Sequence, residues 1–407
     1  MSTTADRRTP AFLDAARRLL DRPLASYQLV LGSTGLLLGL GLIMVLSASS
    51  VLAFNLYDGN SFAIVERQLI FAVLGVIGLV AASRIPLTVL RRLILPFLLV
   101  SIGLVLLTFV PGVGIEVNCN RNWLPLFGSI RLQPSEFVKF GVVLWIAQWW
   151  ARRQRHLDSP RLIMLPVLPI TIGIAMLVVL QGDLGTALVL FALIVGMLWV
   201  VGLPARQMGG ILAVLSVVLV FFVATAPHRV ARMFNFLDPL SAPDGTGFQS
   251  VHGMMALARG GFWGVGLGGS RQKWGVLPEA HTDFILAVIG EELGLFGTFV
   301  VLGLFVLLAI AGVRIATRTP DPFVRYTAAG ITIWISTQAV INIGMVLGLL
   351  PVIGIPLPLI SYGGSSLLVT LVALGLLLNC AKTEPGARRA LAAGRTNRGR
   401  ARLFRRS

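Results

Sequence analysis

The sequence predicts an all-α polytopic membrane protein with ten transmembrane helices and a large extracytoplasmic loop between helices seven and eight. Two observations support this fold class. Of the 407 residues, 56% are hydrophobic and only 13% are charged, and the mean hydropathy is +0.85. The apolar residues also fall in runs close to the ~20 residues that an α-helix needs to cross a bilayer.

The same runs define the domain organisation. We expect residues 1–27 to form a cytoplasmic tail, residues 28–381 one membrane domain, and residues 382–407 a basic cytoplasmic tail. The large outer loop covers residues 225–282, and its apolar and Gly-rich stretches predict ordered helices at the membrane interface. The expected spans are residues 29–48, 68–82, 93–110, 137–150, 163–180, 184–201, 208–224, 284–313, 326–350 and 364–378.

The arginine distribution predicts the orientation. Arginines are concentrated in the expected short loops of one side, and because arginine is retained in the cytoplasm, both termini are expected there. This bias accounts for the net charge of +17 without nucleic-acid binding. The last 26 residues are expected to be a disordered basic arm that binds anionic lipid or a cytoplasmic partner. The arginines of that side are Arg84, Arg91, Arg92, Arg152, Arg153, Arg155, Arg161, Arg206, Arg314, Arg318 and Arg325.

An unusual cluster of charge lies before and inside the eighth expected span. A charged side chain near the hydrocarbon costs at least ~2.5 kcal/mol, so such residues are candidates for function. Asp283 stands at the start of the span, where a carboxylate would suit either a helix cap or acid–base chemistry. Glu291 and Glu292 lie too deep for a cap, so at least one is expected to pair inside the bundle. The cluster comprises Arg271, Lys273, Glu279, His281, Asp283, Glu291 and Glu292.

Two further polar groups lie at the ends of expected spans. Glu136 and Lys139 are three residues apart on one helical face. Lys139 is a turn inside its span and needs a carboxylate partner, either Glu136 or Asp183. Ser135 is expected to cap the start of that helix, and Asp183 is expected to cap the helix that follows a tight turn.

Residues 350–366 combine helix breakers with apolar residues before the last span. Non-helical backbone at membrane depth is tolerated only where it is buried in protein or lines a cavity. The Gly-Gly-Ser-Ser start of the last helix, with Ser361 and Ser365 close by, would suit a bound phosphate or a plain serine cap. Walker, Rossmann, zinc-spacing and serine-elbow patterns do not occur, so a structural transition metal is not expected.

Several of these segments together resemble the SEDS family (shape, elongation, division and sporulation) of membrane glycosyltransferases. The resemblance covers roughly residues 22–382, and within the family the division members are most similar and the elongation members second. The matching segments are GLIMVLSAS (41–49), NRNW (120–123), LQPSEFVK (132–139), GDLGTA (182–187), LPEAHTDFI (277–285), GEELG (290–294) and PLISYGGSS (358–366).

The resemblance implies a peptidoglycan glycosyltransferase that polymerises lipid II at the outer face of the bacterial cytoplasmic membrane during division. A sugar 4-hydroxyl would displace undecaprenyl diphosphate with inversion, which needs one base, and the family motif assigns that base to Asp283. Asp183, Glu291 and Glu292 are expected to be structural or pairing residues. The residues expected to bind substrate are Lys139, Glu136, Arg232, Arg259, Arg271, Lys273, Glu279, His281, Ser361 and Ser365.

The resemblance also implies partners. These are a class B penicillin-binding protein (an FtsI-type transpeptidase) and other division membrane proteins at the septum. A divalent cation, Mg²⁺ or Mn²⁺, could assist the leaving group, although the chain shows no diagnostic ligand set. A lipid II translocase, a non-catalytic division scaffold and an elongation-type enzyme are the alternatives.

Overall fold

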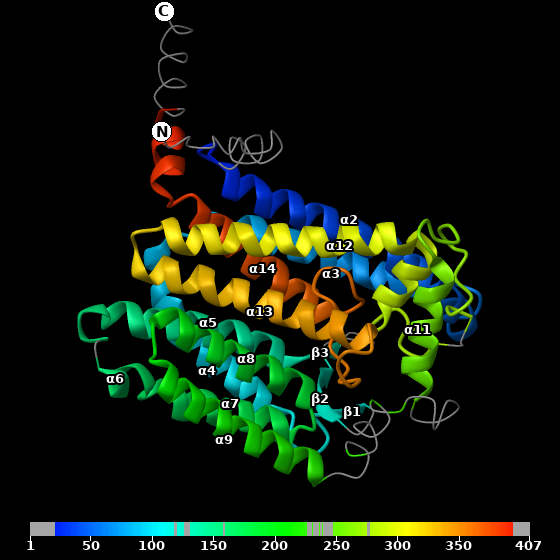
Figure 1. Cartoon of the computed structure of the whole chain (residues 1–407), viewed down its shortest axis with the longest axis horizontal. Coiled ribbons are helices and arrows are strands. Elements are labelled where there is room, and N and C mark those ends of the chain that lie inside the picture. Colours follow the sequence, from blue (N-terminus) through cyan, green and yellow to red (C-terminus); the bar gives the residue numbers. More distant parts are fainter. Residues whose placement is uncertain are drawn as a thin grey trace, which may run out of the picture.

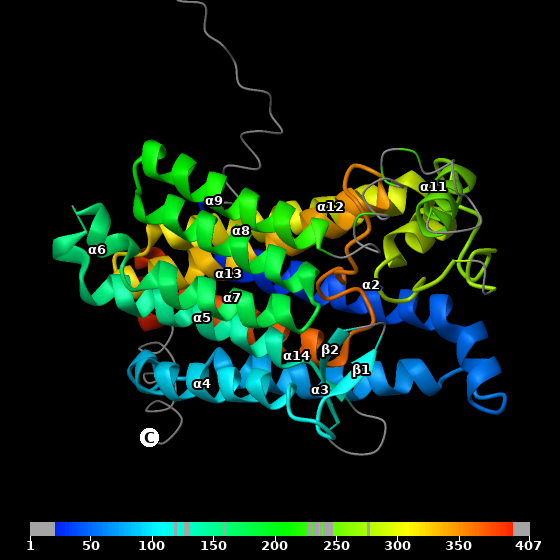
Figure 2. The same ribbon diagram turned by 90° about the horizontal axis from the view of Figure 1, so that it is seen from below.

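The computed structural model describes residues 21–393, except 118–119, 126–130, 158, 226–229, 231–235, 237, 239–246 and 275–276. The long helices lie side by side along the longest axis of the molecule (Figures 1 and 2). In chain order the helices are α2 (Ala25–Leu56), α3 (Ala63–Ala82), α4 (Leu87–Leu107), α5 (Pro134–Arg152), α6 (Pro160–Met164), α7 (Val167–Leu180), α8 (Leu184–Val201), α9 (Ala205–Ala224), α11 (Phe248–Gly260), α12 (Ile285–Arg318), α13 (Pro322–Val346) and α14 (Gly364–Ala381). Of these, α6 has only five residues, and α11 runs across the end of the bundle (Figure 1).

Each of the ten expected spans coincides with a long helix, so the polytopic helical class is confirmed. In the described part of the chain, nine stretches are long and apolar enough to cross a membrane, with α6 and α7 taken as one. The one remaining expected span, residues 137–150, is α5, whose Glu136 and Lys139 lower its hydropathy. Most residues of α5 are buried, so its neighbours in the bundle shield both charges from lipid.

The all-α prediction is wrong in one region. The strands β1 (Ile115–Val117), β2 (Asn120–Pro125) and β3 (Arg131–Leu132) form a small antiparallel sheet in that order. Strands this short carry too little alternation of polar and apolar residues to be recognised from sequence. Arg121 N donates to Gln181 O at 2.9 Å, which fixes the sheet to the turn between α7 and α8.

Helix α12 contains a break. Its 34 residues correspond to about 51 Å, longer than the ~30 Å hydrocarbon core. The backbone leaves helical geometry at Gly294 (φ 68°). Leu295 N donates to Gly261 O, and Val265 N donates to Glu291 O, both at 2.9 Å. The segment after α11 therefore satisfies the backbone groups freed by the break, as a membrane environment requires.

The helices differ in how deeply they are buried. In α13 and α14, 72% and 78% of the most apolar stretch is buried, against 11% in α9, so α13 and α14 form the centre and α9 an edge. The expected large outer loop does contain an ordered helix, α11. Helix α11, the sheet and residues 347–363 lie at one end of the bundle, and the arginine-rich loops lie at the other (Figure 1).

The start of the C-terminal tail is ordered. Residues 385–393 are helical, so the prediction of a disordered arm is wrong there. Ala, Leu and Arg favour helix, and Ala387 is buried, which shows that this turn packs against the protein. The tail beyond residue 393 and residues 1–20 lie outside the described residues.

Candidate active site

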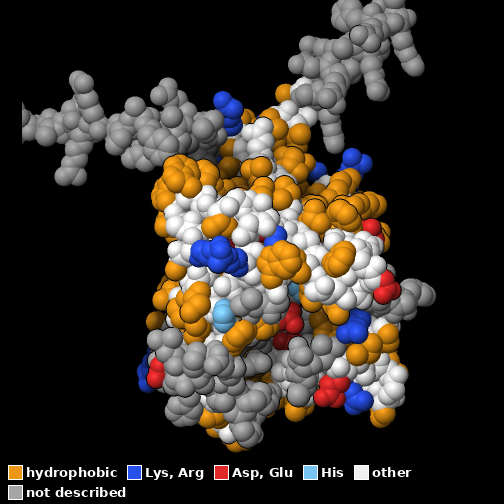
Figure 3. Space-filling model, turned by 90° about the vertical axis from the view of Figure 1, so that its right-hand side faces the viewer, with side chains coloured by type: hydrophobic (Ala, Val, Ile, Leu, Met, Phe, Trp, Pro, Cys, Tyr) orange, Lys and Arg blue, Asp and Glu red, His pale blue; other side chains and the backbone are white. Residues whose placement is uncertain are grey.

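Asp283 lies in the turn before α12, at the end of the bundle that carries the sheet. The N-cap residue of α12 is Phe284, so Asp283 does not occupy the capping position. Its side chain is partly exposed. A Cβ atom built on Gly354 would lie 3.3 Å from Asp283 Oδ2, so the loop backbone closely approaches the carboxylate. Figure 3 looks onto this end and shows Asp and Glu side chains recessed near the middle of the face.

The loop of residues 347–363 faces Asp283 and is non-helical apart from short turns. Its second half is buried in protein, with Leu357 only 1% exposed, whereas residues 347–349 and Gly354 are exposed. Ser361 Oγ accepts a hydrogen bond from Leu357 N at 2.8 Å, and Ser365 Oγ accepts one from Gln133 N at 3.2 Å. Both hydroxyls therefore hold backbone in place, and their binding of phosphate stays a prediction.

His281 and Glu279 lie on the same turn as Asp283. The His281 ring is 5.5 Å from that of Tyr362, and Tyr362 N donates to His281 O at 2.9 Å. Burial lowers the pKa of His281, and the Glu279 carboxylate partly offsets this by raising it. The imidazole is therefore neutral at neutral pH. Glu279 is exposed and accepts a hydrogen bond from Thr282 Oγ1 at 2.6 Å.

Lys139 and Glu136 form a buried ion pair. Lys139 Nζ lies 2.8 Å from Glu136 Oε1, and the two side chains are 1% and 2% exposed. Lys139 Nζ also donates to Gln338 Oε1 at 3.1 Å, and Gln338 Nε2 donates to Pro356 O at 3.0 Å. Of the two partners predicted for Lys139, the structure selects Glu136. Gln338 thus connects the ion pair to the loop of residues 347–363. The pair supports the loop from inside the bundle, and its binding of substrate stays a prediction.

Asp183 is the N-cap residue of α8, as predicted. Its Oδ1 accepts from Thr186 N at 2.9 Å, and its Oδ2 accepts from Gln133 Nε2 at 2.8 Å and from Asn122 Nδ2 at 3.0 Å. The cap predicted at Ser135 is wrong, because Pro134 takes the first helical position and Gln133 becomes the N-cap residue of α5.

Glu291 is fully buried and surrounded by donors. Its carboxylate accepts from Ser270 Oγ at 2.5 Å and from Arg271 N at 3.1 Å, and lies 3.2 Å from Arg259 Nη1. These bonds join α11, the segment after it and α12. Arg259, which was expected to bind substrate, is paired with this carboxylate.

Glu292 is equally buried, and its carboxylate contacts helix α2. Ser47 Oγ of α2 donates to its carboxylate at 2.7 Å, and Lys273 Nζ lies 3.9 Å from it. Lys273 Nζ also donates to Gly268 O at 2.5 Å. Two of the cations expected to hold substrate are thus engaged by Glu291 and Glu292, whereas the Arg271 side chain is exposed. Arg232 lies outside the described residues.

Several residues of this end escaped the sequence analysis. Asn342 Nδ2 donates to Asp283 O at 2.8 Å and to Ile355 O at 2.7 Å. Burial raises the pKa of Tyr362, and the positive charges of Arg67 and Arg131 partly offset this rise. The spacing of Asn342 four residues after Gln338, two amides in one apolar span, was the signal available in the sequence.

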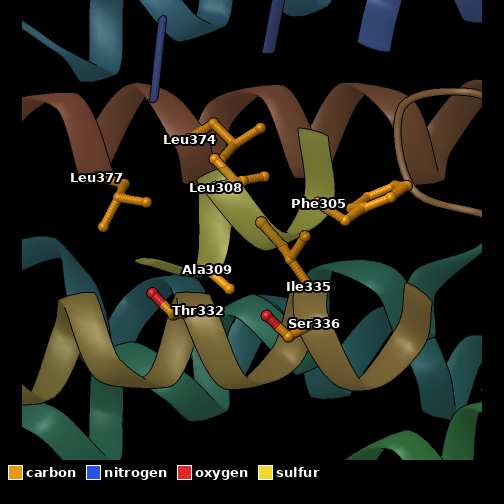
Figure 4. Close-up of a pocket in the computed structure, with 8 residues that line it drawn as sticks. All are labelled: Phe305, Leu308, Ala309, Thr332, Ile335, Ser336, Leu374 and Leu377. Atoms are coloured by element: carbon orange, nitrogen blue, oxygen red, sulfur yellow. The ribbon is translucent and has the colours of Figure 1, made fainter. Parts of the chain in front are cut away.

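In the part of the chain that the structure describes, no three His, Cys, Asp or Glu side chains come together as metal ligands, and assistance by a divalent cation stays a prediction. A small recess between α12, α13 and α14 lies farther along the helices (Figure 4). Its lining is apolar except for Thr332 and Ser336, so it has no ionisable group for catalysis. The remaining lining residues are Phe305, Leu308, Ala309, Ile335, Leu374 and Leu377.

These features define a polytopic helical membrane protein in which, at one end of the bundle, a non-helical loop closely approaches the carboxylate of an aspartate. A family model described as a cell cycle protein, FtsW/RodA/SpoVE, matches residues 27–385, and the chain belongs to this family. The chain is 41% identical over 379 residues to FtsW of Mycobacterium tuberculosis, a probable peptidoglycan glycosyltransferase, covering 93% of this chain and 72% of that relative. It is 39% identical over 349 residues to stage V sporulation protein E of Bacillus subtilis, covering 86% and 95%.

Solved structures share the fold. A chain solved in work on the structural coordination of polymerization and crosslinking by a peptidoglycan synthase complex has a TM-score of 0.72 and 28% identity, covering 88% of this chain and 97% of that one. RodA of Thermus thermophilus has a TM-score of 0.62 and 27% identity, covering 88% and 96%.

Proposed function

We propose that this protein is a division-type peptidoglycan glycosyltransferase that polymerises lipid II, with Asp283 as the general base. One observation carries the proposal: at the end of the bundle opposite the arginine-rich loops, Asp283 is partly exposed while the loop backbone approaches its carboxylate. The names of the curated relatives supply the reaction class, and the 41% identity to an FtsW supports a role in division.

The reaction is a single displacement. The 4-hydroxyl oxygen of the acceptor sugar forms a bond to the anomeric carbon of the donor. The bond from that carbon to the diphosphate oxygen breaks, and its electron pair leaves with undecaprenyl diphosphate. The hydroxyl proton passes to Asp283. A positioned base of this kind contributes about 10²–10⁴-fold to the rate.

The leaving group needs positive charge rather than a proton. Diphosphate departs with its own negative charge, which fixed cations stabilise in a site that excludes water. Arg271 has an exposed side chain for this task, and Arg67 and Arg131 lie near Tyr362 at the same end. Arg259 and Lys273 contribute less directly, because Glu291 and Glu292 engage them.

The proposal includes an orientation in the membrane and a partner protein. The end that holds Asp283 faces outward, because arginine is retained in the cytoplasm and the arginine-rich loops lie at the other end. The similar chain from a peptidoglycan synthase complex supports a crosslinking partner, which we take to be a class B penicillin-binding protein.

The direct experiment is polymerisation of labelled lipid II by purified protein together with that partner. The wild type is expected to give a ladder of glycan strands, and Asp283→Asn none. A matched control is Asp58→Asn, an exposed aspartate in the turn between α2 and α3 whose φ of 49° asparagine also adopts. Asp58→Asn is expected to give the wild-type ladder. A full ladder from Asp283→Asn would overturn the proposal.

A further inference from the structure

Asn342 is a buried amide that links the aspartate turn to the facing loop. It lies on α13 and is 0% exposed. Its Nδ2 group has two protons, and two backbone carbonyls accept from it: Asp283 O at 2.8 Å and Ile355 O at 2.7 Å. Its Oδ1 is buried without a hydrogen-bond partner, so the role of the side chain rests on its two donors.

One of these carbonyls belongs to Asp283, and the other belongs to the loop that approaches the Asp283 carboxylate. Ile355 directly follows Gly354, whose Cβ position would be 3.3 Å from Asp283 Oδ2. Gly354 also has a φ of +77°, a conformation that other residues adopt at a cost. One side chain thus fixes the backbone of the carboxylate-bearing residue and the backbone of the loop opposite it.

We infer that Asn342 is a positioning residue, which sets the distance between the Asp283 carboxylate and the loop of residues 347–363. This inference rests on the proposed function, because it assumes that Asp283 is the base. Small displacements of a catalytic group are costly, since a misplacement of about 1 Å can lower a rate about 100-fold. Asn342 therefore acts on the rate through Asp283 and does not itself touch the substrate.

The chain offers a matched control at the other end of the bundle. Asn379 of α14 also donates to two backbone carbonyls, Ala82 O at 3.2 Å and Ile85 O at 2.7 Å. Asn342→Leu and Asn379→Leu each remove an amide that bridges two carbonyls, and both are expected to lower the unfolding temperature. Only Asn342→Leu is expected to lower kcat for glycan formation, by about tenfold or more, with KM for lipid II unchanged.

The experiment compares kcat, KM and unfolding temperature of both variants with the partner protein present. Equal kcat for Asn342→Leu and Asn379→Leu would overturn the inference, as would a change confined to KM. If Asn342→Leu does not fold, Asn342→Asp keeps the shape, replaces the donors by oxygen and is expected to show the same fall in kcat. Asp283→Asn is measured in parallel: activity in that variant would overturn the proposed function, whereas full activity in Asn342→Asp alone would overturn only the role of Asn342.

Discussion

Asp283 and the pair Glu291–Glu292 lie within ten residues of one another in the chain, yet their surroundings differ. Both glutamates are fully buried, and their carboxylates accept hydrogen bonds from hydroxyl groups and backbone amides and lie near cationic side chains. Asp283 is partly exposed, and Asn342 Nδ2 donates to its backbone carbonyl. The two glutamates therefore hold segments of the fold together inside the protein, whereas Asp283 lies where solvent reaches it.

The buried glutamates also account for the positions of the Arg259 and Lys273 side chains. Glu291 joins α12 to the segment after α11, and Glu292 joins it to α2. Arg259 and Lys273 neutralise this buried negative charge, which would otherwise cost several kcal/mol. Arg259 and Lys273 thus stabilise the fold, whereas the Arg271 side chain is exposed and the arginines near Tyr362, Arg67 and Arg131, come from distant segments.

The largest effect is expected from a third buried carboxylate, Glu136. Lys139→Met leaves this group uncompensated, so we expect a loss of about 3–5 kcal/mol in the free energy of unfolding. The double variant Glu136→Gln/Lys139→Met is expected to recover most of that loss. Denaturant unfolding in detergent measures both. Unchanged stability of Lys139→Met would show that burial of a carboxylate does not mark a structural role in this bundle.

A smaller loss of stability is expected for Glu291→Gln. The amide keeps the shape but loses the charge that faces Arg259, so the free energy of unfolding should fall by about 2 kcal/mol. The rate of glycan formation per folded molecule should stay near that of the wild type. Normal stability with lost activity would place Glu291 with Asp283 and break the comparison.

Gly354→Ala tests the approach of the loop to Asp283. The positive φ costs about 1–2 kcal/mol, and the new methyl group pushes against the carboxylate, so kcat should fall about tenfold. Gly202→Ala is the control, because Gly202 has a φ of +92° and nothing lies within 4 Å of its Cβ position. Equal kcat in the two variants would show that the spacing at Gly354 does not matter.

The smallest effect concerns pH. Because burial holds the folded pKa of His281 below its unfolded value of about 6.5, the folded protein binds fewer protons there. The stability from neutral His281 is fully present above about pH 6.5 and is lost as pH falls through the folded pKa. His281→Gln should therefore reduce the loss of stability on acidification. The unfolding temperature of the wild type and of His281→Gln is measured as a function of pH. An equal fall in unfolding temperature below pH 6.5 in the two proteins would contradict this prediction.

Features that depend on neighbouring positions in the sequence were predictable. The spans follow from the length of apolar runs and the cap at Asp183 from a tight turn. A spacing of three residues made Glu136 one of the two partners expected for Lys139, and the structure decides between them. The expectation that at least one of Glu291 and Glu292 pairs inside the bundle followed from their depth. Each of these rests on local geometry that the chain itself determines.

Features that depend on packing between distant segments were not predictable. The contact of Asn342 with Asp283 joins residues 59 apart, and that of Ser47 with Glu292 joins residues 245 apart. The break in α12 is stable because another segment pairs with its backbone. Arg259 and Lys273 were assigned to substrate because the carboxylate that pairs with a cation cannot be read from a sequence when the two residues lie on different segments of the chain, as Arg259 and Glu291 do.

The central claim is that Asp283 is the general base, whereas Glu291 and Glu292 are structural. Its most direct test is a paired measurement on Asp283→Asn. Lipid II affinity and the rate of glycan formation at saturating lipid II are determined on one preparation with the partner present. We predict unchanged affinity and a rate lowered by about 100-fold or more. A rate equal to that of the wild type would contradict the assignment of the base.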